Sequence, residues 1–362
     1  MADYEAVNAV AAGSIEAING VAKSSVESVN GATTPSSGAT RWALVAADAS
    51  AGYAASSDLT SWTVYETEPN EGTDYKSIHY GKDGSGNPRY VITWGESDAE
   101  IQYTNDITSS SWTTVNLSGS MTIWDAAWGN NVWCAVGTMS NGAQKVWRST
   151  DGATWAEIDI SGATDISTDV VKSIATDGAG NWIFGQKDRI YQSTNDGSAW
   201  SLAVDFDDSD IAGIRCVAYT NSTWVLMLQD TGAGGGCMIR TAAASDRTDW
   251  STAQDLNIGA SAVRLAAGGG KVIAIYSNDH QLATVSGKTC TLATYTANQL
   301  PASNSRNIAT DGNGTWVVVH DQGDISTTPD DGSNWTLSVD GLVIDGTVHS
   351  LDDVTPNVYM PV

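Results

Sequence analysis

Short apolar segments alternate with Gly-, Asn- and Asp-rich turns along most of this chain, a pattern typical of antiparallel strands. Two copies align closely, at 174–182 and 308–316, and both read Ile-Ala-Thr-Asp-Gly-x-Gly-x-Trp. Looser copies occur at 127–133 and 218–224. Asp-Gly and Asn-Asn tips favour tight hairpins because they tolerate positive φ. Each unit is therefore predicted to open with two antiparallel strands, the second of which begins with an aromatic residue.

A second repeat places a Trp four residues after an Asp. The five copies are Asp58–Trp62, Asp151–Trp155, Asp196–Trp200, Asp246–Trp250 and Asp331–Trp335. Asp106–Trp112 is a looser copy, and Tyr295 fills the one gap. Successive members lie 40 to 50 residues apart, which is the period of a propeller blade. With a third strand before each turn and a fourth after it, the sequence predicts an all-β, seven-bladed β-propeller of four-stranded antiparallel blades.

The first blade lacks a first strand before Arg41-Trp42. The segment 348–355 resembles the first strand expected at 171–178. We therefore expect this C-terminal segment to pair beside 41–47 and close the ring, which removes two exposed sheet edges. Residues 39–362 are predicted to form the propeller, and residues 1–38 a separate N-terminal segment for attachment or oligomerisation.

The N-terminal segment contains its own repeat, with a period of 11 residues. The copies are 4–14, 15–25 and 26–36. Asn19-Gly20 and Asn30-Gly31 occur at the same phase, which favours short apolar segments interrupted by turns over a continuous helix. Three such repeats bury little surface alone, so we expect another copy, a different protein or the propeller itself to hold them.

Composition narrows the choice of partners. The chain has 17 Lys and Arg against 42 Asp and Glu, a formal net charge of −25. Such a surface repels nucleic acid and anionic lipid, so neither is expected as a partner. The N-terminus has no basic and apolar regions of a secretory signal, and no apolar run is long enough to cross a bilayer. The four cysteines show no metal-binding spacing and are expected to be reduced and buried. They are Cys134, Cys216, Cys237 and Cys290.

The turn at 149–155, Ser-Thr-Asp-Gly-Ala-Thr-Trp, and its copy at 193–200 resemble the Asp-box turns of sialidase-like and sortilin-like propellers. This resemblance implies the fold and not an activity. The Asp carboxylates are expected to accept N–H bonds from their own turns, and the Trp rings to pack each blade against its neighbour. A calcium ion at each Asp is the alternative, although a single carboxylate makes a poor cage.

The segment Ile15-Glu-Ala-Ile-Asn-Gly-Val21, with its echo at 26–32, resembles the repeated "INGV" segments of structural proteins from tailed bacteriophages, marine ones especially. This resemblance implies a virion protein, either a tail fibre or tail accessory or a head decoration, assembled in the host cytoplasm. Residues 1–36 would then contact other virion proteins, and the propeller would be displayed outward. A glycan-binding or glycan-hydrolysing propeller and a general protein-interaction scaffold are the alternatives.

We find little support for catalysis in the sequence. A sialidase needs three Arg around a substrate carboxylate, a Tyr nucleophile paired with Glu, and an Asp acid/base. No Arg lies in the Arg-Ile-Pro context typical of that family, and the adjacent Tyr65 and Glu66 would face opposite ways on a strand. The four His fall in different blades, without a Ser/His/Asp or metal-binding grouping: His79, His280, His320 and His349. No enzyme activity, metal or cofactor is expected.

One candidate site comes from aligning the first strands. Two residues before the apolar anchor of each strand stand Lys76, Trp124, Lys172, Arg215, Val263, Arg306 and His349. First strands line the channel of a propeller, so these side chains are predicted to form a ring near one mouth. Two interpretations stay open. Each cation could pair with an acid of the next blade, or the ring could hold an anion such as a phosphate or an acidic sugar of a host glycan.

Overall fold

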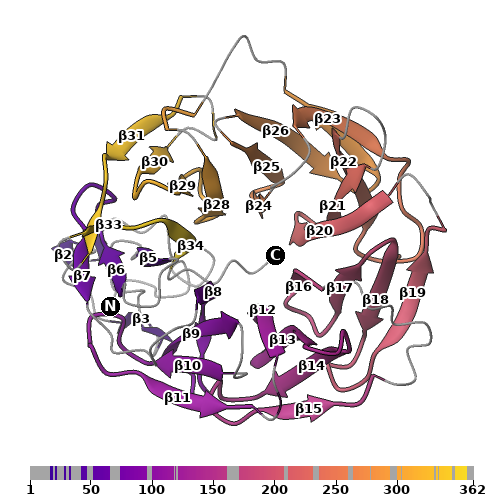
Figure 1. Cartoon of the computed structure of the whole chain (residues 1–362), viewed down its shortest axis with the longest axis horizontal. Helices are drawn as coiled ribbons and strands as arrows, with labels where there is room; N and C mark the ends of the chain where they lie inside the picture. Colours follow the sequence, from indigo (N-terminus) through magenta and orange to yellow (C-terminus); the bar gives the residue numbers. More distant parts are fainter. Residues whose placement is uncertain are drawn as a thin grey trace.

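The computed structural model shows seven four-stranded antiparallel sheets arranged in an all-β ring (Figure 1). The seven-bladed propeller predicted from the sequence is therefore confirmed. The structure describes residues 17–18, 21–22, 28–29, 32–33, 42–46, 52–65, 74–95, 100–117, 119, 121–160, 171–207, 211–230, 236–259, 264–277, 279–293, 300–302, 304–329, 332, 334–344 and 347–356.

The strands of each blade are named from the channel outwards, beginning with the first three blades. Blade 1 contains β34 (Leu351–Pro356), β5 (Trp42–Ala46), β6 (Tyr53–Ser56) and β7 (Thr63–Tyr65). Blade 2 contains β8 (Asp74–Lys82), β9 (Pro88–Gly95), β10 (Glu100–Thr104) and β11 (Thr113–Asn116). Blade 3 contains β12 (Met121–Gly129), β13 (Val132–Met139), β14 (Gln144–Ser149) and β15 (Ala156–Ile158).

The other four blades follow the same order. Blade 4 contains β16 (Ile174–Thr176), β17 (Trp182–Gln186), β18 (Arg189–Ser193) and β19 (Ser201–Asp205). Blade 5 contains β20 (Ile211–Thr220), β21 (Thr223–Asp230), β22 (Gly236–Ala243) and β23 (Gln254–Gly259). Blade 6 contains β24 (Arg264–Gly268), β25 (Lys271–Tyr276), β26 (Asp279–Ser286) and β27 (Thr289–Leu292). Blade 7 contains β28 (Ser305–Thr310), β29 (Trp316–His320), β30 (Ile325–Thr328) and β31 (Thr336–Val339).

The C-terminal strand closes the ring. β34 pairs antiparallel with β5, from Leu351 opposite Ala46 to Pro356 opposite Trp42. The predicted closure is confirmed, although Val348 belongs to a separate small hairpin of β32 (Val343–Ile344) and β33 (Thr347–Val348). Because β34 fills the innermost place of blade 1, the first and last parts of the propeller sequence share one sheet.

Within the N-terminal segment, two pairs of short strands are described. β1 (Ala17–Ile18) pairs with β2 (Val21–Ala22), and β3 (Ser28–Val29) pairs with β4 (Ala32–Thr33). This pairing agrees with the expectation of short segments rather than a helix. The predicted boundary between residues 38 and 39 lies outside the described residues.

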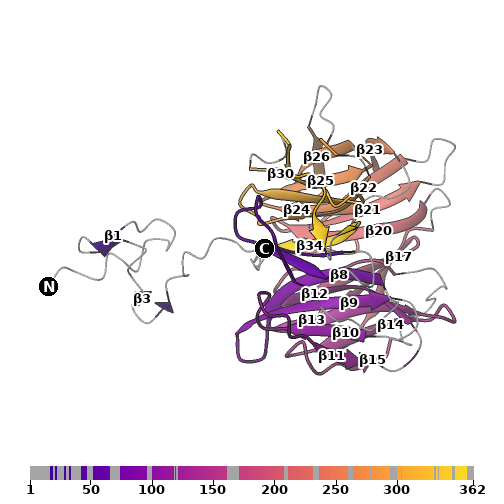
Figure 2. The same cartoon turned by 60° about the vertical axis from the view of Figure 1, so that its left-hand side comes forward.

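The blades pack face to face around the channel (Figure 2), and the hydrophobic core is divided into seven clusters, one between each pair of neighbouring blades. Five Trp stand at the first or second position of the second strand of their blade, and each is at most 2% exposed: Trp42, Trp133, Trp182, Trp224 and Trp316. The Asp-turn Trp rings pack in the cluster that their blade shares with the preceding one, as predicted. These are Trp62, Trp112, Trp155, Trp200, Trp250 and Trp335.

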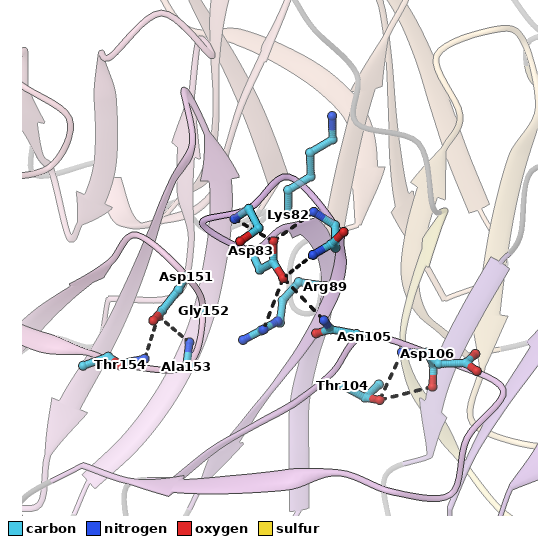
Figure 3. A network of polar contacts seen from close by, with 12 residues as sticks. Lys82, Asp83, Arg89, Thr104, Asn105, Asp106, Asp151, Gly152, Ala153 and Thr154 are labelled. Atoms are coloured by element: carbon cyan, nitrogen blue, oxygen red, sulfur yellow. Dashed lines mark hydrogen bonds and ion pairs between the residues drawn. The ribbon is translucent and has the colours of Figure 1, made fainter. Parts of the chain in front are cut away.

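The Asp-box turns have the predicted hydrogen bonds. The Asp151 carboxylate accepts from the backbone N–H of Ala153 at 2.8 Å and of Thr154 at 2.7 Å (Figure 3). Trp155 Nε1 donates to Gly152 O at 3.2 Å. Equivalent bonds reach Asp58, Asp106 and Asp246. N–H donors from Ser61 and Thr60 lower the pKa of Asp58 to about 2, so these carboxylates act as charged caps of their own turns.

In one turn of this repeat, the capping residue differs from the predicted one. In the turn at 193–200 the bonds are made by Asn195, whose Oδ1 accepts from Ala199 N at 3.0 Å. Asp196 instead has a positive φ of 58° and accepts from Asn130 Nδ2 of the neighbouring blade at 2.7 Å. An amide oxygen can cap such a turn as a carboxylate does. The capping residue is therefore Asn195, one residue before the Asp that the Asp–Trp spacing predicts. Asp331 and Tyr295 lie outside the described residues.

Candidate functional site

The first strands of the blades surround a cavity of about 820 Å³ at the propeller axis. The residues at its mouth stand near the beginning of each first strand: Lys76, Trp124, Lys172, Arg215, Arg264, Arg306 and Asp352. We call these seven residues the channel mouth. A volume of this size is typical of small-molecule sites.

β-Bulges place most of these side chains. The register shifts at Lys76 in β8, Trp124 in β12, Arg215 in β20, Arg306 in β28 and Asp352 in β34. A bulged residue is left outside the ladder and its side chain is re-aimed. The same distortion therefore recurs at the same point of five blades, and the bulged residue of each lines the cavity.

The bulges correct the predicted ring in two blades. In blade 1 the bulge falls at Asp352, whereas His349 precedes β34 and does not line the cavity. In blade 6 Arg264 lines the cavity one register position later than the other members, and Val263 lies outside the described residues. In blade 1 the alignment counts back from Leu351, whereas Val354, two residues after the bulged Asp352, holds the anchor position. In blade 6, β24 pairs without a register shift over Arg264–Gly268. The predicted positions Lys76, Trp124, Lys172, Arg215 and Arg306 do come together.

Four cations of the mouth stand on four consecutive blades, 4 to 7, and we call them the cationic arc: Lys172, Arg215, Arg264 and Arg306. Within the described residues, no carboxylate lies within ion-pair distance of any of the four. Arg215 Nη2 donates to Gln229 Oε1, a neutral partner. Burial, together with the charges of Arg215 and Arg264, lowers the pKa of Lys172. The arc therefore holds positive charge that the described part of the fold leaves unneutralised.

The aromatic member lies between two lysines. Lys76 Nζ and Lys172 Nζ each lie 5.8 Å from the ring centroid of Trp124. Both distances are within the range of cation–π attraction. The indole thus joins blades 2, 3 and 4 at the mouth and keeps the two ammonium groups beside the cavity.

Beneath the mouth, polar side chains link one blade to the next. Asp353 Oδ2 accepts from Ile78 N at 2.7 Å, and Asp353 Oδ1 accepts from Asn307 Nδ2 at 2.5 Å. Asp125 Oδ2 accepts from Ile174 N at 2.9 Å, and Ser173 Oγ accepts from Val217 N at 3.2 Å. His79 Nε2 also contacts Ala126 N at 3.2 Å. Together these contacts link the first strands of blades 7, 1, 2, 3, 4 and 5 in order.

Two of the linking groups have shifted proton affinities. Burial raises the pKa of the Asp353 carboxyl to about 7, against the opposing effects of His79 and of the N–H donors Ile78 and Val354. Burial lowers the pKa of His79, but the hydrogen bond and charge of Asp125 outweigh it and leave that pKa raised. Both groups therefore retain a proton to higher pH than usual.

The structure brings Ser77, His79 and Asp125 together, a grouping that the sequence analysis missed. Ser77 Oγ lies 2.7 Å and Asp125 Oδ1 3.1 Å from the same atom, His79 Nε2. In a catalytic triad the Ser and the Asp contact different ring nitrogens. Ser77 Oγ is also bonded to Thr93 Oγ1 at 2.7 Å. The grouping therefore differs from a triad, and its contacts link blade 2 to blade 3.

Neither a metal site nor a membrane-spanning helix is found in the described part of the chain. No cysteine is paired: Cys134, Cys216 and Cys237 are buried and Cys290 is half-buried. Tyr65, the candidate nucleophile, lies on the outer strand β7 with its ring stacked on Tyr53 at 5.0 Å. It is therefore far from the channel in the order of strands.

Comparison with solved structures supports the fold alone. YCF48 from Cyanidioschyzon merolae is 12% identical, with a TM-score of 0.53 over 73% of this chain and 84% of that one. A functionally unknown protein from Desulfotomaculum acetoxidans is 9% identical, with a TM-score of 0.59 over 88% of this chain and 99% of that one. No protein-family model and no curated protein sequence matches. At these identities the similarity shows only that the chain shares the β-propeller fold.

Proposed function

We propose that this chain is a non-enzymatic bacteriophage virion protein, a tail fibre or tail accessory or a head decoration, whose propeller is displayed for contact with the host surface. Residues 1–38 attach the propeller to other virion proteins. The support for attachment is the 11-residue repeat, which resembles repeats of phage structural proteins and in which β1–β2 and β3–β4 each pair only as small hairpins. Such hairpins are marginal alone and gain stability from a partner.

The observation that carries the binding role is the cationic arc. A chain with a net charge of −25 keeps four cations together at one cavity without carboxylate partners among the described residues. Such charge is costly unless a ligand uses it. The mouth is therefore the surface of the propeller best suited to recognition.

Glycan hydrolysis is the second candidate, because Arg215, Arg264 and Arg306 all line the cavity. Hydrolysis of the sialidase type also needs an activated tyrosine. Tyr80 and Tyr219 line the cavity, but burial raises the pKa of both phenols, which opposes formation of a phenolate. Binding without hydrolysis accounts for the arc without a nucleophile.

Deletion of residues 1–36 tests attachment. The truncated chain is expected to remain a soluble, folded monomer and to be absent from purified particles, because blade residues form the core clusters in the described part of the chain. A matched control replaces residues 1–36 with a Gly/Ser segment of equal length. Particles that still incorporate either variant at the wild-type level would contradict the proposed attachment role.

A further inference from the structure

The ligand of the channel mouth can be narrowed by charge. The cationic arc supplies four positive charges from four different sheets. Burial is the largest cause of the lowered pKa of Lys172, and repulsion from Arg215 and Arg264 adds to it. One monovalent anion leaves three of them uncompensated. A ligand with two or more separate anionic groups relieves more of this repulsion.

The opposite side of the cavity limits where those anionic groups can lie. Asp352 and Asp353 of blade 1 and Asp125 of blade 3 line the same cavity. Carboxylates repel anions but accept hydrogen bonds from hydroxyl groups. The part of the ligand that faces these carboxylates is therefore uncharged and rich in hydrogen-bond donors, while its acidic groups face blades 4 to 7.

The rest of the surface limits the length of the charged ligand. Lys76 and the cationic arc account for five of the 17 Lys and Arg, so the remaining 12 stand against 42 Asp and Glu. A long polyanion such as nucleic acid leaving the mouth would meet this acidic surface and be repelled. A short chain end that enters the cavity avoids it.

From these three constraints, and resting on the proposed binding role, we infer that the channel mouth binds the end of an acidic oligosaccharide that carries at least two carboxylate or sulfate groups. The hydroxyl groups of the sugar rings meet the acidic side of the cavity. The guanidinium groups of Arg215, Arg264 and Arg306 match the planar carboxylate or the sulfate oxygens.

Calorimetric titration of the full chain with defined probes tests this inference. Trigalacturonic acid is expected to bind at least tenfold more tightly than galacturonic acid, and uncharged galactotriose to bind at least tenfold more weakly than the acidic trimer. A sulfated carrageenan fragment of similar length separates sulfate from carboxylate as the preferred group. Binding should weaken as salt rises from about 50 to about 500 mM, because exposed charges are screened.

A double variant, Arg215→Gln/Arg264→Gln, should lose at least tenfold in affinity without a decrease in melting temperature. The matched control is Arg189→Gln, which removes an Arg paired with Asp205 on outer strands and should leave binding unchanged. Three results would each overturn the inference. The acidic monomer or galactotriose could bind as tightly as the acidic trimer, or tripolyphosphate could bind more tightly than the acidic trimer. Absence of binding by every probe would do so too, whereas the virion role is judged separately by particle incorporation.

Discussion

The outer rim of the propeller, meaning the third and fourth strands of each blade with the turn between them, and the channel mouth use charged groups in opposite ways. At the rim, cations face acids on the neighbouring strand or turn: Lys145 with Glu157, Arg189 with Asp205, and Lys288 with Asp249. At the mouth, the cationic arc has no carboxylate within ion-pair distance among the described residues. The rim neutralises its charge locally and the mouth does not.

The acids differ in the same way. Rim carboxylates such as Asp58 and Asp151 accept from their own turns, and these bonds lower their pKa values. Asp353 beneath the mouth accepts from two other blades, and its burial raises its pKa. The rim is therefore built from self-contained turns, whereas the channel depends on contacts that exist only when the ring is closed. This contrast separates residues that stabilise single blades from residues that can serve a ligand.

The largest expected effect is on the packing of the rim. Trp200 is 6% exposed and packs between blades 3 and 4, and its Nε1 donates to Gly197 O at 3.1 Å. Trp200→Ala should lower the free energy of unfolding by roughly 3–5 kcal/mol, because it leaves a cavity. Trp155→Ala, at a half-buried copy of the same turn, should cost less. Thermal melting measures both, and ligand affinity of the folded fraction should not change. Equal costs for the two variants would show that burial does not govern the role of these rings.

Most of the fold could be predicted from the sequence, because the repeat of turns and aromatic positions is local. The two positions where the prediction was wrong have different causes. His349 is predicted in the ring by counting two residues back from Leu351, but the strand that closes the ring begins there and its anchor is Val354, two residues after Asp352. The four-residue Asp–Trp spacing selects Asp196, whereas the residue that caps this turn is Asn195, five residues before Trp200.

The polar links beneath the mouth could not be predicted for a different reason. Asn307, Asp353 and Ile78 belong to three blades and are far apart in the chain, so only ring closure brings them together. Their pKa values depend on burial at the axis, which periodicity does not report. The unneutralised charge of the arc was likewise one of two open interpretations until the partners were known.

The second expected effect is a dependence of stability on pH that originates in the channel. The pKa of Asp353 is about 7 in the fold and near 3.8 otherwise. The folded state therefore holds a proton that the unfolded chain releases, and this contribution is complete below about pH 4 and lost as pH rises through about 7. At about 1.4 kcal/mol per pKa unit, the loss is up to about 4 kcal/mol. The raised pKa of His79 acts in the same direction.

Asp353→Asn removes this titration. Between about pH 5 and about pH 8, the melting temperature of this variant should therefore fall less than that of the wild type. Asp151→Asn is the rim control. The lowered pKa of Asp151 contributes stability that is lost only as pH falls below the usual carboxyl range. The Asp151→Asn variant should therefore keep the wild-type dependence of melting temperature on pH above about pH 5. A wild-type slope in the Asp353→Asn protein would show that Asp353 is ionised throughout this window.

The smallest expected effect is the relief of repulsion within the arc. Arg264 contributes to the lowered pKa of Lys172, so Arg264→Met should raise that pKa and stabilise the fold by no more than about 1 kcal/mol. Lys145→Met at the rim removes a cation that is paired with Glu157 and should instead destabilise the fold slightly. Both changes delete one positive charge. Opposite effects on stability would therefore come from the local surroundings of each residue and not from the net charge. NMR titration of Lys172 and melting at low and high salt measure the effects, and the gain from Arg264→Met should shrink as salt screens the arc. A loss of stability for Arg264→Met at low salt would mean that the arc is neutralised within the fold, and the contrast between rim and mouth would then disappear.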